Sequence, residues 1–186
     1  MVVDFDDFSE ASNRLDLLER LRVINPRFRC TVFAIPALGT EDFWRSTPDW
    51  IELAVHGWEH PHPREAEDWT LEQAGFVMDH CAELFEHGFK APGWQISDAT
   101  YVAARERGWW IADHWDNDHR RPAGQLTHVI SRAAGAGEDP NHWHGHIPNE
   151  CGNGIAETFD RLAMRVELAE HFELISEVVT PYDPNP

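Results

Sequence analysis

The sequence lacks the marks of a disulfide-bonded, membrane-spanning or exported protein. It has three cysteines, Cys30, Cys81 and Cys151, which lie far apart and include no Cys-x-x-Cys pair. We therefore expect no disulfide framework, which fits a reducing compartment. No apolar run approaches the roughly 18 residues of a membrane span. Residues 1–7 contain neither the basic nor the long apolar segment of a signal peptide, so we expect a cytoplasmic location unless the sequence is a trimmed domain.

Basic residues are also scarce. The chain has 15 Lys and Arg against 33 Asp and Glu, which gives a net charge of −18. Nucleic-acid binding needs clusters of basic side chains to contact phosphates, and the sequence has none. We therefore expect no nucleic-acid partner and no membrane partner, and the sequence indicates no protein partner. The acidic surface is expected to serve solubility.

Two residue types are abundant. The 186 residues include 12 histidines and 9 tryptophans, and 42% of the chain is hydrophobic. This length and composition predict one globular domain over residues 1–186. Histidine is the commonest metal ligand and titrates near neutrality, while tryptophan offers flat faces for stacking. The combination favours a metal site or acid–base chemistry beside a flat ligand.

Short apolar runs alternate with amphipathic segments along the chain. The pattern predicts strands over residues 2–6, 30–35, 51–55, 88–91, 109–112, 127–131, 141–147 and 172–175, and helices over residues 12–24, 70–87, 97–107 and 155–169. Such alternation is typical of an α/β protein with a parallel sheet. A complete (β/α) barrel takes about 250 residues, so we expect a distorted, shortened (β/α) barrel.

Polar side chains gather where the predicted strands end. They are Asp6 and Asp7, His56 and His60, Lys90, Asp113 and His114, and His142, His144 and His146. In parallel α/β folds the carboxyl ends of the strands converge on one rim, where active sites form. We therefore expect these side chains to share one site.

Each of these features also has a simpler interpretation. An Asp-Asp pair after a strand can cap a helix or lie in a solvated turn. A His-x-x-x-His pair suits zinc, yet it arises by chance in a chain rich in histidine. Pro92-Gly93 is by itself a turn. The three alternating histidines could form a polar edge of the sheet.

Together, the motifs resemble the polysaccharide deacetylase family, also called the NodB-homology domain or carbohydrate esterase family 4. Asp4-Phe5-Asp6-Asp7-Phe8 stands where the family has Thr-Phe-Asp-Asp-Gly, and His56-Gly57-Trp58-Glu59-His60 matches its His-Ser/Thr-x-x-His. Lys90-Ala91-Pro92-Gly93 approximates Arg-x-Pro-Tyr/Gly, and Asp113-His114-Trp115 approximates an acid near a tryptophan. Trp143-His144-Gly145-His146-Ile147 corresponds to the apolar strand that ends in a catalytic histidine. The resemblance implies a NodB-type fold over nearly the whole chain.

Three of the departures from the family motifs bear on the expected site. Phe8 replaces a glycine and is expected to narrow the entrance to the site. Gly57 replaces a serine or threonine. Lys90 replaces an arginine with a point charge, so bidentate orientation of a carboxylate is lost. These departures indicate a divergent, short, stand-alone member with a non-standard substrate.

The resemblance implies a role for each group. Asp7, His56 and His60 would bind a divalent metal, zinc in the first instance, and three protein ligands leave the open position of a catalytic site. Asp6 would be the general base. His144 is the first choice and His146 the second choice for the general acid. Asp113 or Lys90 would orient the base and the acid.

Substrate binding is assigned to aromatic residues near the motifs and to one turn. They are Trp58, Trp94, Trp115 and Trp143, with Pro92 and Gly93. The resemblance implies a metal-dependent hydrolase that removes the N-acetyl group of an amino sugar or polysaccharide, using metal-activated water, an Asp base and a His acid. The alternatives are a same-fold metal hydrolase acting on another small amide or modified sugar, and a non-catalytic carbohydrate-binding module.

Overall fold

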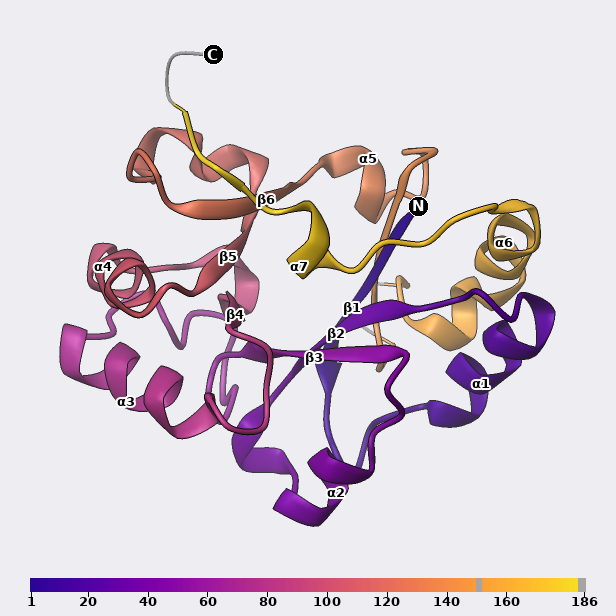
Figure 1. The fold of residues 1–186 in the computed structure, drawn as a ribbon, viewed down its shortest axis with the longest axis horizontal. Helices are drawn as coiled ribbons and strands as arrows, with labels where there is room; N and C mark the ends of the chain where they lie inside the picture. Colours follow the sequence, from indigo (N-terminus) through magenta and orange to yellow (C-terminus); the bar gives the residue numbers. More distant parts are fainter. Residues whose placement is uncertain (150–151, 184–186) are drawn as a thin grey trace.

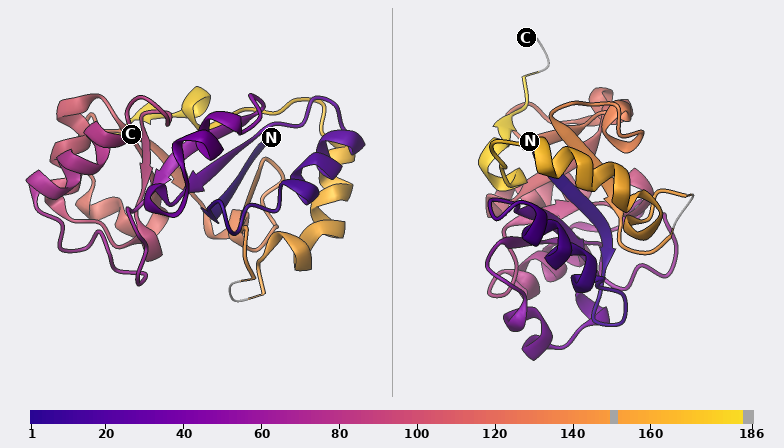
Figure 2. Two further views of the ribbon diagram at one scale, coloured as in Figure 1. Left: turned by 90° about the horizontal axis from the view of Figure 1, so that it is seen from below. Right: turned by 90° about the vertical axis from the view of Figure 1, so that its right-hand side faces the viewer.

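A computed structural model describes residues 1–149 and 152–183, and its strands form one curled sheet (Figure 1; Figure 2). The strands are β1 (Val2–Phe8), β2 (Cys30–Ala34), β3 (Ile51–His56), β4 (Gly88–Lys90), β5 (Trp110–His114), β6 (Leu126–Ile130), β7 (His142–His146) and β8 (Thr180–Pro181). Their order is β7-β1-β2-β3-β4-β5-β6-β8, and β8 alone pairs antiparallel, with β6. This curled half-barrel confirms the predicted distorted, shortened (β/α) barrel.

Helices and short turns connect the strands (Figure 1). They are α1 (Leu15–Ile24), α2 (Glu41–Ser46), α3 (Leu71–Cys81), α4 (Asp98–Arg107), α5 (Arg132–Gly135), α6 (Ile155–Leu168) and α7 (Ile175–Val178), with 3-10 turns η1 (Pro36–Leu38), η2 (Pro92–Trp94) and η3 (Trp115–Arg120). The predicted start of α3 is confirmed, because the Thr70 side chain and Gln73 form a capping box.

The buried side chains of the sheet divide between its two faces. Along β2 and β3, alternate residues such as Val32 and Leu53 join a large core that includes buried residues of α1, α3, α4 and α6. The intervening residues Phe33 and Ala54 join a smaller core with Ile175 of α7. This alternation follows from the two-residue period of a strand. We call the second face, which the four long helices leave uncovered, the inner face.

The end of the chain differs from the prediction. Residues 172–175 are not a strand: Glu173 makes an isolated bridge with Val2, and α7 begins at Ile175. The reason lies in side chains of the sheet, because Thr31 Oγ1 accepts from the N–H of Ile175 at 3.0 Å, and Glu52 Oε1 accepts from the N–H of Ser176 at 3.3 Å. Burial raises the pKa of Glu52. Helix α3 ends at Cys81, six residues before the predicted end.

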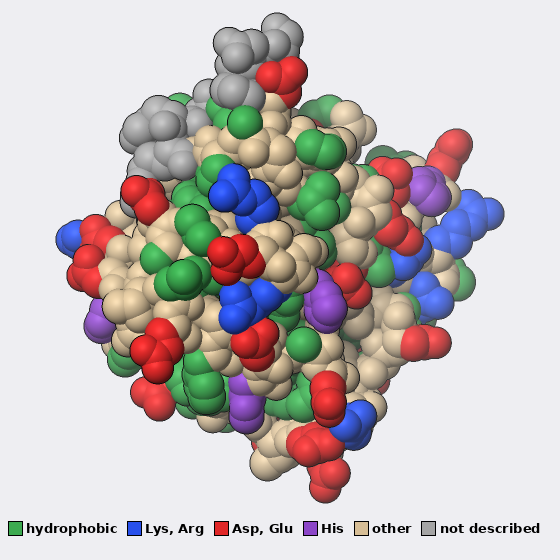
Figure 3. Space-filling view, turned by 60° about the vertical axis from the view of Figure 1, so that its left-hand side comes forward, with side chains coloured by type: hydrophobic (Ala, Val, Ile, Leu, Met, Phe, Trp, Pro, Cys, Tyr) green, Lys and Arg blue, Asp and Glu red, His purple; other side chains and the backbone are tan. Residues whose placement is uncertain are grey.

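The surface is predominantly acidic, as the composition predicts. On the face in Figure 3, acidic side chains are interspersed with single basic ones and with small apolar areas. Cys30 and Cys81 are buried free thiols, and Cys151 lies outside the described residues. Among the described residues, no helix has both the length and the apolar character needed to cross a bilayer.

Phe8 does not narrow an entrance, contrary to the expectation from the sequence. Its side chain is fully buried at the end of β1. The ring stacks on Phe43 at a centroid distance of 5.7 Å and contacts Trp44 at 6.2 Å. The residue that replaces the glycine of the family motif is therefore part of the core between β1 and α2.

Truncation of Phe8 tests this role. We expect Phe8→Ala to lower the free energy of unfolding by about 3–5 kcal/mol, because a buried phenyl group leaves a cavity. Phe76→Ala on α3 is the matched control, since Phe76 is 57% exposed and its loss should change the free energy by less than about 1 kcal/mol. Urea denaturation measures both. Equal effects of the two substitutions would contradict the core role of Phe8.

Candidate active site

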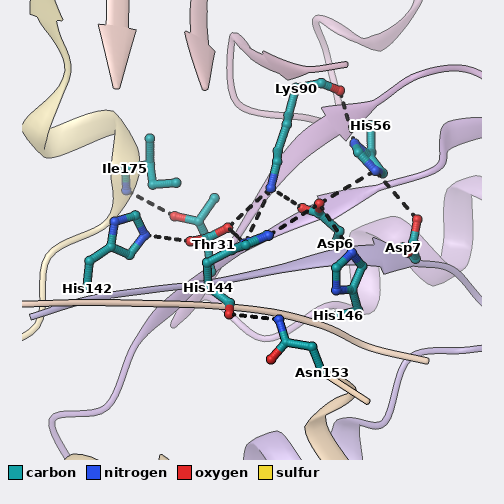
Figure 4. A network of polar contacts seen from close by, with 11 residues as sticks. Asp6, Asp7, Thr31, His56, Lys90, His142, His144, His146, Asn153 and Ile175 are labelled. Carbon is teal, nitrogen blue, oxygen red and sulfur yellow. Dashed lines mark hydrogen bonds and ion pairs between the residues drawn. The ribbon is translucent and has the colours of Figure 1, made fainter. Parts of the chain in front are cut away.

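Strands β1 and β7 bring aspartates and histidines side by side on the inner face. In this parallel pair Asp4 lies opposite His144, and Asp6 lies opposite His146. His142 lies two residues before His144 on β7, so it is on the same face of the strand, because side chains alternate between the two faces. Figure 4 shows Asp6 and the three histidines directed into one network of polar contacts.

A bulge in β1 allows the neighbouring residues Asp6 and Asp7 to reach the same site. Successive side chains of a regular strand point to opposite faces. Here the register with β2 slips between Phe5 and Phe8, and Asp7 adopts the left-handed conformation with φ 63°. As a result, both carboxylates approach His56 Nε2, with Asp7 Oδ1 at 3.5 Å and Asp6 Oδ2 at 3.8 Å.

Asp7, His56 and His60 place three atoms that can ligate a metal close together. Asp7 Oδ1 lies 3.5 Å from His56 Nε2 and 3.4 Å from His60 Nε2. Tetrahedral bonds of about 2.0–2.1 Å place two ligand atoms about 3.3 Å apart, so these distances fit a zinc-like ion. His56 Nδ1 lies 3.0 Å from the carbonyl of Lys90, to which its N–H can donate, leaving Nε2 free. Burial lowers the pKa of His56 to about 3, which favours the neutral imidazole that binds metals.

Glu65 shapes the loop that contains His60, a role that its residue type and spacing do not indicate. Its carboxylate accepts three successive backbone N–H groups, from Trp58 at 3.0 Å, Glu59 at 3.0 Å and His60 at 3.1 Å. No periodic pattern marks such a residue, because the contact depends on the fold of the loop. The carboxylate therefore holds the turn between the two histidines.

The same loop explains the glycine at position 57. Gly57 has φ +68°, a conformation that residues with a side chain rarely adopt. A Cβ atom at this position would lie 2.1 Å from Glu65 Oε2 and 2.8 Å from Pro92 Cγ. The serine or threonine of the family motif would thus collide with the carboxylate that holds this loop.

A second group of polar residues lies beside Asp7, His56 and His60, and Lys90 is at its centre, next to Asp4, Asp6 and His144. It is fully buried, and its Nζ donates to Asp6 Oδ1 at 2.6 Å. The ring of Trp94 lies 4.1 Å from the ammonium, which adds a cation–π contact. Burial favours the neutral form of Asp6, yet the Lys90 ammonium, followed by His56, outweighs it and lowers the pKa of Asp6 to about 2. Lys90 thus keeps Asp6 ionised.

His144 and His146 both approach Asp6, but their surroundings differ. The Nε2 atom of each lies 3.9 Å from Asp6 Oδ2. His144 Nδ1 is 2.8 Å from Asp4 Oδ1, a fully buried carboxylate. His146 Nδ1 is buried and has no hydrogen-bond partner among the described residues. His144 is therefore the better-oriented imidazole.

Asp113 is engaged elsewhere. Its carboxylate accepts from Tyr101 Oη at 2.5 Å, from Arg121 Nε at 2.9 Å and from Asn117 Nδ2 at 2.8 Å. These contacts brace the segment that follows β5. Among the described residues, it is Lys90 rather than Asp113 that contacts the Asp6 carboxylate.

The four tryptophans near the motifs differ in exposure. Trp115 is 44% exposed, and Trp58 and Trp94 are half-buried. Trp94 also contacts His144, with a centroid distance of 5.5 Å. Trp143 is 2% exposed and belongs to the helix-covered core, so it cannot contact a substrate. The ring of Trp58 packs on Phe76 and His80 of α3. Trp94 and Trp115 are therefore the two of these four tryptophans that lie near His144 or its neighbour His114.

The charges of the site suit a divalent cation. Asp4, Asp6 and Asp7 are 0%, 4% and 8% exposed, and Lys90 is fully buried beside them. When these groups are ionised and the histidines are neutral, one ammonium faces three carboxylates. Buried charge without compensation is costly, and a divalent ion at Asp7, His56 and His60 would remove the imbalance. The donor set, two imidazoles and a carboxylate, is typical of zinc and related ions.

Comparison with known proteins shows a shared fold. No family model and no curated protein matches the sequence. The structure is similar to the Xyl-CE4 domain of a multidomain xylanase from the hindgut metagenome of Trinervitermes trinervoides, with a TM-score of 0.58, 16% identity, and coverage of 95% of this chain and 87% of that one. It is also similar to a family 4 acetyl xylan esterase from Clostridium thermocellum in complex with a cobalt ion, with a TM-score of 0.54, 11% identity, and coverage of 95% and 88%.

A third similar structure is a peptidoglycan N-acetylglucosamine deacetylase, with a TM-score of 0.56, 12% identity, and coverage of 93% of this chain and 84% of that one. The resemblance to family 4 carbohydrate esterases and polysaccharide deacetylases that the motifs indicated is thus confirmed in the fold. The three-dimensional likeness extends over almost the whole chain, although the identity is low.

Substitution of Glu65 tests how the metal-ligand loop is held. We expect Glu65→Gln to lower the affinity for Zn²⁺ about 10–100-fold, because the amide nitrogen cannot accept the N–H groups that orient His60. Competition with a chromophoric chelator measures the affinity. Glu72→Gln, an exposed glutamate on α3, is the matched control and should leave the affinity unchanged. An unchanged affinity in Glu65→Gln would contradict the proposed role of the loop.

Proposed function

We propose that this chain is a metal-dependent hydrolase that removes the acetyl group from an N-acetylated amino sugar or polysaccharide. The observation that supports this most directly is the meeting of two groups on the inner face. The metal-ligand set contributes His56, whose Nε2 lies 3.8 Å from Asp6 Oδ2, and Asp6 belongs to the acid–base set with Lys90 and His144. A metal site next to an oriented acid and base suits hydrolysis of an acyl group.

Asp7, His56 and His60 would hold the metal. Their atoms are 3.4 and 3.5 Å apart, close to tetrahedral spacing, whereas Asp6 lies 3.9 Å from both His144 and His146. Asp6, His144 and His146 form this second, wider group of possible metal ligands, and Asp6 also accepts a hydrogen bond from Lys90. We therefore assign the second group to acid–base chemistry. When bound, such a metal lowers the pKa of a coordinated water and polarises a carbonyl oxygen. Zinc is our first choice.

Asp6 would act as the general base. Lys90 keeps the carboxylate ionised and orients it through Oδ1, which leaves Oδ2 directed toward His56 and the histidines of β7. An ionised carboxylate accepts the proton of the water that attacks the acetyl carbon. The new C–O bond then forms while the proton passes to Asp6.

His144 would act as the general acid. The C–N bond of the amide breaks only when the departing nitrogen receives a proton, because an amide anion is a poor leaving group. His144 Nε2 can supply that proton, and its Nδ1 is held by Asp4. The products are acetate and the free amine of the sugar.

Aromatic residues would bind the sugar ring. Trp94 contacts Lys90 and His144 in the site, and His114 lies between Trp94 and the exposed Trp115, at centroid distances of 5.0 and 5.2 Å. This series of rings runs from the acid–base pair to the surface, where flat faces can stack on a sugar. In the turn after β4, Pro92 is buried and Gly93 is exposed, so of these two only Gly93 would contact a substrate, and Trp58 instead packs on Phe76 and His80 of α3.

We also propose that residues 1–186 form a single catalytic domain. The metal ligands come from β1, β3 and the loop after β3, and the acid–base residues from β1, β4 and β7. The site residues thus extend from β1 near the start of the chain to β7, so a division of the chain between these strands would separate parts of the site. The fold of the neighbouring structures, among them a deacetylase and an acetyl xylan esterase, agrees with such a domain.

Asp6→Asn tests the assigned base. We expect acetate release from N-acetylglucosamine oligomers to fall about 10²–10⁴-fold, because an amide cannot accept the proton. Bound zinc should remain at the wild-type stoichiometry, since Asp7, His56 and His60 are unchanged. A wild-type protein that binds zinc but releases no acetate from any N- or O-acetylated sugar would contradict the proposed function and favour another amide substrate.

Substitutions of Lys90 test how the base is held. We expect Lys90→Met to lower kcat at least about 10²-fold, because Asp6 loses the buried ammonium that orients it and keeps it ionised. Lys90→Arg retains the positive charge and should retain more activity than Lys90→Met. Steady-state kinetics at saturating zinc measures both. Equal activity of Lys90→Met and wild type would exclude this role.

A further inference from the structure

We propose that Asp4 is the positioning residue that orients His144, in a role that the sequence motifs had left to Asp113 or Lys90. This inference rests on the proposed function. Asp4 lies on β1 two residues before Asp6 and is fully buried. Its Oδ1 lies 2.8 Å from His144 Nδ1.

The contact determines which nitrogen of His144 is available to a substrate. A carboxylate accepts only, so Nδ1 of His144 must hold the proton and donate it to Asp4. The free nitrogen is then Nε2, which faces Asp6 Oδ2 at 3.9 Å. A proton on Nε2 produces an imidazolium whose charge is next to the Asp4 carboxylate. Asp4 therefore sets the tautomer, the ring orientation and the stability of the acid form.

The second oxygen of Asp4 is held as firmly as the first. His142 Nε2 donates to Asp4 Oδ2 at 2.6 Å. Because both oxygens have imidazole partners, the carboxylate cannot rotate away from His144. Burial raises the pKa of Asp4, but the adjacent His144 and Lys90 outweigh it and keep the pKa well below its usual value. Asp4 thus stays ionised in the interior of the sheet.

The other carboxylates near His144 are engaged differently. Asp113 accepts from Tyr101, Arg121 and Asn117, so its contacts direct it away from the histidines of β7. Asp6 is paired with Lys90 at 2.6 Å. Position 4 is a threonine in the family motif that the sequence resembles, so this chain has a carboxylate where that motif has a hydroxyl. Because Asp4 lies two residues before Asp6 on β1, its side chain is on the same face of the sheet as Asp6 and contacts His144.

Charged and titratable groups from four strands face His144. They are Asp4 and Asp6 of β1, Lys90 of β4, His114 of β5, and His142 and His146 of β7. The nearest cation, Lys90 Nζ, lies 3.4 Å from His144 Nδ1 and opposes protonation of the ring. Removal of the Asp4 carboxylate would remove the negative charge that balances this cation. The imidazolium of His144 would then lose the negative charge that stabilises it.

Asp4→Asn and Asp4→Thr test the proposal by kinetics in zinc-loaded protein. We expect kcat for acetate release to fall about 10²–10⁴-fold with KM and zinc stoichiometry unchanged. The basic limb of the pH–rate profile should move to lower pH. Glu52→Gln is the matched control, because Glu52 is a buried carboxylate of the same face that binds Thr31 and Ser176, and it should leave kcat and the profile unchanged.

Nitrogen NMR of ¹⁵N-histidine-labelled wild-type protein tests the contact without activity, with His144→Gln used to assign the signal. We expect His144 to be protonated at Nδ1 in the neutral form. Protonation at Nε2, or an Asp4→Asn variant with unchanged kcat and pH limb, would overturn the role of Asp4. A zinc-bound wild type that releases no acetate would overturn the proposed function, and the NMR result would then decide the Asp4 contact by itself.

Discussion

The parallel pairing of β1 with β7 is the constraint on which the site depends. It places Asp4 opposite His144 and Asp6 opposite His146, and the two-residue period of a strand turns all four side chains to the inner face. If either strand were shifted by one residue, its polar side chains would point into the helix-covered core, where Val3, Phe5 and Trp143 now lie. The same register that buries those apolar residues therefore assembles the polar site.

The balance of charge in the buried site depends on one buried cation, Lys90. Lys90 is the only lysine of the chain, and it is fully buried between Asp6 and the ring of Trp94. Burial of an ammonium is costly, and the nearby carboxylates of Asp4 and Asp6 offset that cost. Three carboxylates exceed one ammonium, and this excess favours a divalent cation at the edge of the cluster. The candidate metal ligands and the residues proposed as base and acid are thus coupled by charge as well as by distance.

Some parts of the site could be predicted because residue type and spacing are sufficient evidence. The Asp6-Asp7 pair and the His56-x-x-x-His60 pair each contain donors suited to metals, and their predicted strand ends converge in the structure. Lys90 reaches Asp6, as one of the two interpretations expected. Glu65 could not be predicted in the same way, because three backbone N–H groups converge on it only after the loop has folded. The motif predicts Phe8 at an entrance to the site, but only the folded chain shows that α2 covers it with Phe43 and Trp44.

Local patterns in the sequence determined the alternation of strands and helices, the polar strand ends and the types of chemistry that those residues allow. These properties depend on neighbours along the chain, so the sequence reveals them directly. Only the tertiary structure decided that Asp4 contacts His144 and His142, that Asp113 turns to Tyr101 and Arg121, and that Trp143 is buried in the core. Such contacts join residues far apart in the sequence, and they depend on strand order and register, which long-range packing establishes.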